Sequence, residues 1–321
     1  MILLYRDKPI FVSCFNHQLG SVERDLSQLK AEKLLLSSAD TLSAIGYGHN
    51  VGLARNESLL SLAMNPVSLA LQEVREPAGF FFQHSLAESA LLPYDPAETN
   101  LALRTRYFPA EMMRQLQVDH LPYFCSFASG CAGFSSVLGL AGGSLSCSSD
   151  DRPAICVMAD CIPPGVPYDM LEERILASDH SSAFAVGREQ RGYQLLGINY
   201  YSTTRTKVPF LEIVKRTVRM IKELAANLGL DLAGSNSAIH YPNIFPETWV
   251  TVTRYLRSPQ IEHVVDGMFD RAHCGATDSV ISLAKLHRSE EGRIHIVVNY
   301  GIGLHLGVCI FKETDANESA T

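Results

Sequence analysis

Short apolar segments alternate with helical repeats along this chain, and this alternation limits the possible folds more than any other feature. Six segments of the first 204 residues are predicted to be strands: 9–15, 78–83, 121–127, 153–160, 181–187 and 193–201. Short runs that stay apolar throughout are typical of strands that are buried on both faces of a sheet. The sequence therefore predicts a layered α/β fold.

The same alternation begins again after about residue 204. An amphipathic helix is predicted over 210–230 and ends at Gly229, followed by a strand and turn over 235–243, helices over 246–256 and 272–286, and a closing strand pair over 294–312. No low-complexity linker and no sequence repeat marks the change. We therefore expect two halves of the same type, residues 1–204 with the candidate nucleophile and residues 205–321 with the candidate base.

Composition and charge argue against several classes of protein. Apolar residues make up 46% of the 321 residues, charged residues 19%, and the formal charge is −7 with no long basic run. These values fit a globular enzyme and argue against nucleic acid or an anionic membrane as a partner. The N-terminal apolar run is too short for a signal peptide, and we see no uninterrupted apolar run that would span a bilayer. We expect a cytoplasmic protein.

One of the eight cysteines has an unusual setting. Cys131 stands where the strand over 121–127 gives way to a helix of small and apolar residues. The free N–H groups and the positive dipole end of a helix favour a thiolate and can bind an oxyanion. A cysteine that is simply buried would also fit this stretch. The other seven cysteines read as core residues, and the absence of any CxxC pair argues against a zinc site.

A nucleophilic cysteine needs a base, and His240 is a candidate. It stands at the end of the apolar strand in "SAIHYPN", before a turn that contains proline. A single histidine at a strand end is more often structural, and the chain has ten other histidines. The residues alone therefore leave the base open.

Four segments, in order, resemble the ketoacyl-ACP synthase III branch of the thiolase superfamily. "SGCAGFSSVLGLA" resembles the segment in which the nucleophilic cysteine is followed by Ala-Gly-Phe, and "IHYPN" resembles the histidine segment, so that His240 and Asn243 match. "NYGIGLHLGVCIF" is similar to the closing glycine-rich hairpin, and "LASDHSSAFAV" to a degraded Phe-Gly-Asp-Gly-Ala segment. The likeness covers nearly the whole chain, weakly before residue 105.

The resemblance implies a thiolase-like, five-layered αβαβα fold of two similar halves. It implies that Cys131 is the nucleophile. It also implies that the backbone N–H groups of Cys131, Ile302 and Gly303 face the thioester oxygen. Family members form homodimers through a strand at the two-fold axis. We expect the strand in "PAICVMADC", residues 153–161, in that place because it is apolar throughout.

One departure from the family pattern bears on the reaction. Condensing members carry an asparagine between the histidine and the closing hairpin, and here that position falls on Cys274. The segment "HCGATD" instead resembles the His-x-Gly-x-x-Asp form of related acyltransferases, in which Cys, His and Asp form a triad. The match implies that Asp278 orients His240, although Asp278 could also cap the helix that follows it. His273 is expected to be structural.

The expected activity is therefore transfer of an acyl group from a CoA or carrier-protein thioester to Cys131, and then to a hydroxyl or amine acceptor in secondary metabolism. Asn243, Cys274 and His273 are expected to line the substrate site. No permanently bound cofactor and no metal is expected, since the CoA or phosphopantetheine thioester is a substrate. The alternatives are a condensing synthase that forms a carbon–carbon bond, and a non-catalytic subunit of a heterodimeric synthase. The second alternative fits poorly because such subunits usually lose the cysteine.

Overall fold

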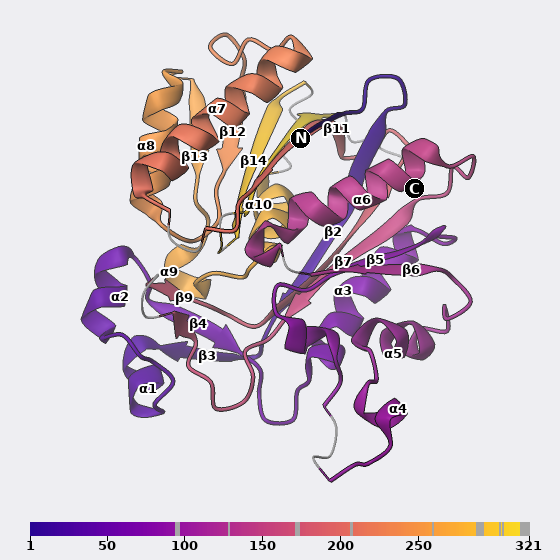
Figure 1. Cartoon of the computed structure of the whole chain (residues 1–321), viewed down its shortest axis with the longest axis vertical. Coiled ribbons are helices and arrows are strands. Elements are labelled where there is room, and N and C mark those ends of the chain that lie inside the picture. Colours follow the sequence, from indigo (N-terminus) through magenta and orange to yellow (C-terminus); the bar gives the residue numbers. More distant parts are fainter. Residues whose placement is uncertain are drawn as a thin grey trace.

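One continuous 11-stranded sheet forms the framework of the molecule (Figure 1). Apart from β1 (Ile2–Leu4), which pairs with β11 (Tyr193–Ser202), it divides into two five-stranded parts with the same strand order, called the first and the second sheet below. The computed structural model describes residues 1–93, 97–127, 129–170, 174–205, 208–258, 260–286, 292–301, 303 and 305–314. The strands of the first sheet are β2 (Ile10–Leu19), β5 (Gly79–Gln83), β6 (Tyr123–Ser126), β7 (Ala154–Asp160) and β10 (His180–Gly187). Those of the second are β11 (Tyr193–Ser202), β12 (Ser237–His240), β13 (Ile261–Val264), β14 (Ile294–Gly301) and β15 (His305–Glu313).

The strand order shows that the two halves are alike. The first sheet runs β6-β5-β7-β10-β2 and the second runs β13-β12-β14-β15-β11. In both, the first strand along the chain lies at one end and the third at the other. The two first strands, β2 and β11, pair with each other over a short stretch. The second sheet therefore begins with β11, a strand that the division at residue 204 assigns to the first half.

Helices cover the sheets in three further layers (Figure 1). On the outer face of the first sheet lie α3 (Leu59–Glu73) and α5 (Phe108–Gln115), which share a core cluster with β5, β7 and β10. On the outer face of the second sheet lie α7 (Phe210–Leu228) and α8 (Pro246–Leu256). Between the sheets lie α6 (Gly133–Cys147) and α10 (Thr277–Leu286). This arrangement confirms the predicted five-layered α/β fold.

The middle layer explains the composition of its helices. Residues 133–147 contain no charged residue, and α6 packs against β5, β7 and β10 on one side and β14 and β15 on the other. By length and composition, Gly130–Cys147 could cross a membrane, contrary to the expectation that no apolar run is long enough to do so. Half of this segment is buried between the sheets, as in the core helix of a soluble protein. Its apolar character is therefore explained by packing.

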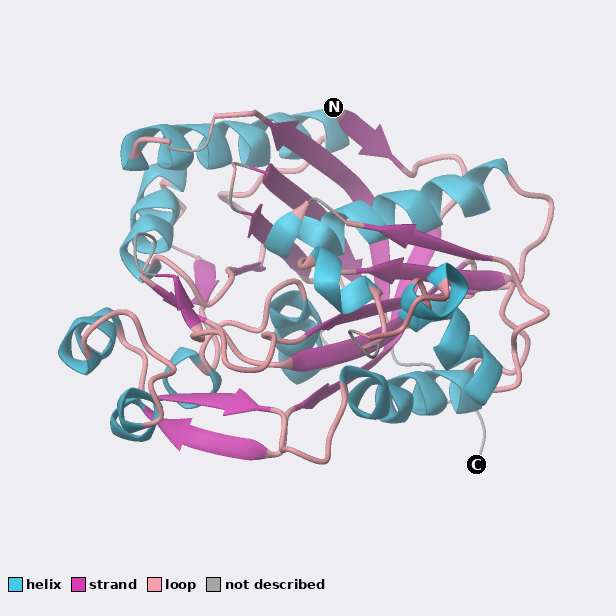
Figure 2. Ribbon diagram, turned by 60° about the horizontal axis from the view of Figure 1, so that its bottom comes forward, coloured by secondary structure: helices cyan, strands magenta, loops and turns pink. Residues whose placement is uncertain are grey.

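Smaller elements extend one end of the sheets, as Figure 2 shows. The β3 (Val22–Asp25) and β4 (His49–Gly52) hairpin carries α1 (Leu26–Ala31) and α2 (Ala39–Ile45) and packs beside β9 (Ile175–Leu176) and α9 (Met268–Arg271). The remaining elements are β1 (Ile2–Leu4), β8 (Asp169–Met170), α4 (Leu101–Arg104) and the 3₁₀ turns η1 (Ala87–Ala90) and η2 (Gly130–Ala132). From the hairpin unit, Tyr47 donates a hydrogen bond to the Asn243 carbonyl, 2.9 Å away.

The strand expected at a two-fold axis is not at a sheet edge. The strand β7 pairs with β5 on one side and with β10 on the other. Its backbone groups are therefore used within the chain, and β7 cannot continue the sheet into a second copy. That expectation was wrong because burial on both faces does not distinguish an inner strand from an edge strand. The outer strand of this half is β6, which pairs with β5 alone among the described strands.

Candidate active site

Cys131 lies in a tight turn between the first sheet and the middle layer. It is the central residue of η2, directly before α6, and its side chain is partly exposed. The turn is closed by a hydrogen bond from the Ala132 N–H to the Ser129 carbonyl, 3.1 Å apart. Gly130 has φ +51°, in the left-handed region that glycine adopts without strain. The glycine before the cysteine therefore makes the turn possible.

Two strand ends hold this turn from opposite sides. The Gln83 amide, at the end of β5, donates to the Gly130 carbonyl at 3.3 Å and packs against the Cα of Gly133. At the end of β14, Gly301 approaches so closely that a Cβ there would overlap the Ser129 carbonyl. Both glycines are thus required by close packing, and the Cys131 turn is fixed by both sheets.

His273 is the histidine that the structure places beside Cys131. Its ring is buried, and Nδ1 donates to a carboxylate oxygen of Asp278 at 2.6 Å. Nε2 is buried and makes no hydrogen bond at normal geometry. Burial lowers the pKa of His273, but the negative charges of Cys131 and then Asp278 outweigh it and raise the pKa to about 10. The ring is therefore a cation at neutral pH and lies beside Cys131, in a contact that can tighten when substrate binds.

The backbone turns sharply just before His273. Ala272 has φ +50° and ψ −147°, a conformation that is strained for a residue with a side chain. The turn is held by hydrogen bonds from the Ala272 N–H to the Met268 carbonyl and from the His273 N–H to the Leu176 carbonyl, at 3.2 and 2.9 Å. This strained turn directs the ring of His273 into the site.

Asp278 is held by four donors. Besides His273, it accepts hydrogen bonds from the backbone N–H groups of Asn243, at 2.9 Å, and Cys274, at 3.2 Å, and it forms a buried ion pair with Arg271. Burial raises the pKa of Asp278, but Arg271 and His273 outweigh it and lower the pKa well below its usual value. Asp278 is therefore ionised and fixes the orientation of His273.

The structure corrects the predicted pairing of His240 with Cys131 and Asp278. The His240 ring is buried in the interior, with Nδ1 2.7 Å from the Ser282 hydroxyl and Nε2 2.9 Å from His295. The other nitrogen of His295 lies 3.1 Å from Glu313. Both nitrogens of His240 are thus occupied away from Cys131. Burial, followed by His295 and Arg293, keeps its pKa well below the usual value.

His273, expected to be structural, therefore takes the place expected for His240. The sequence did contain a signal, because a histidine five residues before an aspartate is the spacing of the His-x-Gly-x-x-Asp segment itself. Arg271 was missed altogether. It precedes that segment by two residues, and nothing in its local sequence distinguishes it from a surface arginine.

The other predicted binding residues have structural partners. Both N–H groups of the Asn243 amide donate to the carbonyls of Asp266 and Ala272, at 2.8 and 2.9 Å, so this side chain supports the loop before His273. Cys274 is fully buried, with its thiol 3.6 Å from the Arg271 carbonyl. Neither side chain is exposed to a substrate here.

The rest of the predicted oxyanion site is described only in part. Gly303 has φ +85°, and Ile302 lies outside the described residues. Among the described residues, no group of three or more His, Cys, Asp or Glu side chains is arranged to hold a metal ion.

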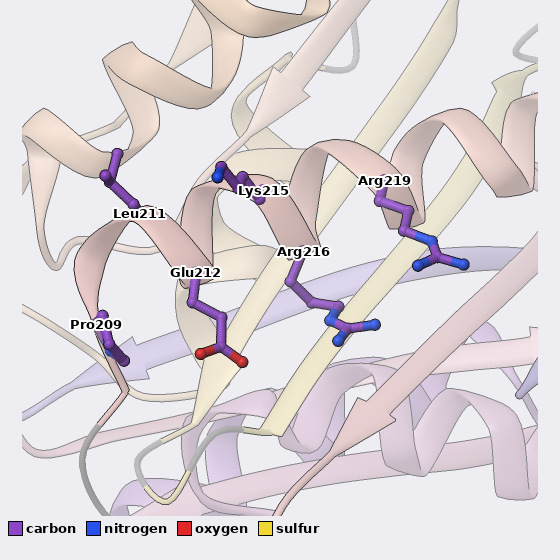
Figure 3. A pocket seen from close by; sticks show the side chains of 6 residues that line it. All are labelled: Pro209, Leu211, Glu212, Lys215, Arg216 and Arg219. Carbon is purple, nitrogen blue, oxygen red and sulfur yellow. The ribbon is translucent and has the colours of Figure 1, made fainter.

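A cationic row lies on the outer layer, apart from these residues. A hollow of about 440 Å³ on α7 is lined by Pro209, Leu211, Glu212, Lys215, Arg216 and Arg219. Figure 3 shows Glu212, Arg216 and Arg219 projecting from one side of the helix. The Arg216 guanidinium lies 4.0 Å from the ring centre of Tyr201, which holds it in place.

Solved structures of thiolase-like enzymes share this fold. ChlB3, an acyltransferase, aligns with 96% of this chain and 98% of its own, with a TM-score of 0.76 and 15% identity. The 3-oxoacyl-(acyl carrier protein) synthase III of Pseudomonas aeruginosa PAO1 aligns with 96% of this chain and 99% of its own, with a TM-score of 0.74 and 15% identity. AbyA1, a tetronic acid condensing enzyme, aligns with 95% of this chain and 99% of its own, with a TM-score of 0.72 and 13% identity.

These likenesses confirm the predicted fold, that of ketoacyl-ACP synthase III-like structures. No protein-family model and no curated protein matches the sequence. At sequence identities of 15% or less, these structures establish the fold of this chain but not its reaction. Acyltransferases and condensing enzymes both occur among structures of this fold.

Proposed function

We propose that this protein is an acyltransferase in which Cys131 receives an acyl group from a thioester and passes it to a hydroxyl or amine. The observation that carries the proposal is the set formed by Cys131, His273 and Asp278. In this set a cationic imidazole faces the cysteine, and its other nitrogen donates to a fixed carboxylate. Such a set can activate a nucleophile in one step and an acceptor in the next.

In the first step, the Cys131 thiolate attacks the thioester carbonyl. The carbon–sulfur bond of the donor breaks, and the departing thiolate takes the proton from His273. Acylation removes the charge of Cys131, and among the charges that raise the pKa of His273, that of Cys131 acts most strongly. The pKa of His273 therefore falls, and the neutral ring becomes available as a base.

In the second step, an alcohol or amine attacks the acyl group on Cys131. Neutral His273 takes the proton of the acceptor as the new bond forms, and Cys131 departs as a thiolate. The enzyme thereby returns to the initial ion pair. Asp278 keeps Nδ1 protonated throughout, so that Nε2 is the nitrogen that exchanges the proton.

Condensation is the second candidate, since condensing enzymes share this fold. In condensing relatives the matched histidine and an asparagine bind the thioester oxygen during decarboxylation of a malonyl group. Both ring nitrogens of His240 are occupied in the interior, and the residues from His273 to Asp278 contain no asparagine. Both features favour acyl transfer. The non-catalytic subunit is disfavoured because the Cys131 set is complete.

The proposed donor is a CoA or carrier-protein thioester, used as a substrate. Both donors are anionic, and Lys215 and Arg216 on α7 would attract them, whereas Arg219 in the same hollow is paired with Glu223 at 2.6 Å. Acyltransferase and tetronic acid-forming relatives support a place in secondary metabolism with a small-molecule acceptor. We propose a cytoplasmic location, in keeping with a fold whose apolar helix lies in its core.

The reaction type is tested by offering two thioesters to the same preparation. With acetyl-CoA we expect an acetyl adduct by intact mass, absent in Cys131→Ala, whereas Cys147→Ala, which alters an exposed cysteine at the end of α6, serves as a matched control and keeps the adduct. With malonyl-CoA or a malonyl carrier protein we expect no Cys131-dependent release of carbon dioxide. A missing oxyanion donor typically costs about 10²–10³ in rate. Decarboxylation with a β-keto product would instead establish condensation.

We propose that the protein is a homodimer joined at β6. Its outer edge has no partner strand among the described residues, and Tyr123 and Phe124 are 41% and 55% exposed. An edge strand with exposed aromatic residues is suited to pairing with its own copy about a two-fold axis.

Light scattering is expected to give twice the chain mass of 35.3 kDa. Phe124→Asp should shift the protein toward the monomer. Val250→Asp serves as the matched control, because Val250 is similarly exposed, at 48%, but lies on α8 in the opposite outer layer. A wild-type monomer at micromolar concentration would contradict the proposal.

A further inference from the structure

The buried amide of Asn299 connects the two helices of the middle layer. Asn299 lies on β14 and is 1% exposed. Its Oδ1 accepts a hydrogen bond from the Ser135 hydroxyl, and its Nδ2 donates to the Ser279 hydroxyl at 2.6 Å. Ser135 is on α6 and Ser279 is on α10. A single side chain therefore bridges the two helices through one acceptor and one donor.

Both serines lie close in sequence to residues of the set formed by Cys131, His273 and Asp278. Helix α6 begins two residues after Cys131, and Ser135 is in its first turn. Ser279 directly follows Asp278 in the first turn of α10. The bridge thus joins the helix that carries the nucleophile to the helix that carries the carboxylate. Its length constrains the separation of Cys131 from the Asp278–His273 pair.

The neighbouring strand leaves room for this bridge. Gly307 of β15 is paired with Asn299, and a Cβ at Gly307 would overlap the Ser135 hydroxyl. The Cys309 thiol, two residues further on, donates to the same hydroxyl at 3.4 Å. The first turn of α6 therefore fits against β15 only because residue 307 is glycine, and Ser135 is held from two strands.

An apolar residue at position 299 would leave two buried hydroxyl groups without this partner. Such groups cost stability, and they favour a shift of one helix that finds them other partners. Thr277 and Ser282 hold α10 against β10 and β12, through Ser182 and His240, but neither contact extends to α6. A shift on loss of Asn299 would therefore move the two helices relative to each other.

We propose that Asn299 is a positioning residue that sets the distance between Cys131 and the His273–Asp278 pair. It touches neither of them and acts through Ser135 and Ser279. The inference rests on the proposed acyl transfer for its kinetic consequence. A displacement on the order of 1 Å can slow a reaction about 100-fold. Separation would also weaken the attraction of the Cys131 charge for the proton on His273.

Two measurements on Asn299→Ala test this role. Transfer from acetyl-Cys131 to n-propanol, followed by intact mass in a single turnover, should slow by about 10- to 100-fold, although the acetyl adduct still forms. In the free enzyme, NMR of labelled histidine should show the pKa of His273 moving from about 10 toward its ordinary value. The His273 signal is assigned by its loss in His273→Gln.

A matched control separates positioning from general stability. Asn199 is also a buried asparagine in the second sheet, and it donates to the Met220 carbonyl at 3.2 Å, facing α7. Asn199→Ala should lower the melting temperature and leave both readouts unchanged. If Asn299→Ala does not fold, Ser279→Ala provides a second test, because it removes only the hydroxyl that accepts from Asn299. It should also slow transfer from acetyl-Cys131 and shift the pKa of His273. Ser279→Thr keeps the hydroxyl and should behave like the wild type.

The outcomes distinguish this inference from the proposed function. If the transfer rate and the pKa of His273 in Asn299→Ala match those of Asn199→Ala, the positioning role is wrong. If the wild type forms no acyl adduct, the proposed function fails. The pKa of His273 then still decides whether Asn299 controls the spacing of the site.

Discussion

Replacing His273 by alanine is expected to slow the transfer of an acyl group from Cys131 by about 10²–10⁴. His273 is the ring whose pKa responds to the charge of Cys131, and its other nitrogen is held by Asp278. Without it, nothing in the set removes the proton of the acceptor. Formation of the acyl-enzyme should also slow, because the thiolate loses its adjacent cation. Single-turnover mass spectrometry measures the two steps separately.

The same experiment on His240 distinguishes the two histidines. His240→Gln should lower the melting temperature, because Ser282 and His295 both lie within hydrogen-bonding distance of this ring. Its rate of acyl transfer should stay within a few-fold of the wild type. The reverse pattern, with His240→Gln inactive and His273→Ala active, would show that the histidine matched by family resemblance acts in the reaction.

Replacing Asp278 by alanine is expected to destabilise the protein by about 3–5 kcal/mol and to slow transfer as well. The larger part of the destabilisation comes from Arg271, whose guanidinium is left buried without its ionic partner. The backbone N–H groups of Asn243 and Cys274 lose an acceptor at the same time. Urea unfolding at neutral pH measures the free energy difference.

The pH dependence of unfolding gives a second test of the same pair. The pKa of Asp278 is lowered in the folded state, so its contribution is present above about pH 4, the ordinary aspartate pKa, and is lost as pH falls toward the folded value. The pKa of His273 is raised to about 10, so its contribution is present below about pH 6.5 and is lost as pH rises through 10. Asp278→Ala should remove the loss of stability at acid pH and reduce the loss at alkaline pH only in part, because Cys131 raises the pKa of His273 more strongly than Asp278 does.

A partly exposed ion pair provides the matched control. Asp266 pairs with the exposed Lys285 at 2.6 Å, close to the same loop. Asp266→Ala removes a carboxylate without leaving a buried charge, and such pairs contribute little. It should lower the free energy of unfolding far less than Asp278→Ala does. The losses of stability at acid and at alkaline pH should both remain. Equal losses in the two variants would mean that the burial of Arg271 does not determine the effect.

The layered fold could be predicted from the sequence because its signals are local. Runs such as residues 153–160 stay apolar throughout, which requires cover on both faces, and the absence of charge over residues 133–147 fits a helix that lies between two sheets. The glycine before Cys131 and the small residues around it likewise reflect a turn formed within a few residues. Such patterns depend on neighbours along the chain, so they can be read without knowing the fold.

The choice of base and the edge of the sheet were decided by tertiary structure. His240 and His273 both lie near turns of the second half. The His-x-Gly-x-x-Asp spacing links His273 to Asp278, but it does not show which ring reaches Cys131. Packing directs His240 toward Ser282 and His295, whereas the strained turn at Ala272 and the buried Arg271–Asp278 pair direct His273 toward the thiol. Similarly, β7 and β6 read alike as apolar strands, and only the sheet order makes β6 the edge. Contacts between residues far apart in the chain determine both outcomes, so the sequence by itself determined the layers and the nucleophile turn but not the partner of Cys131.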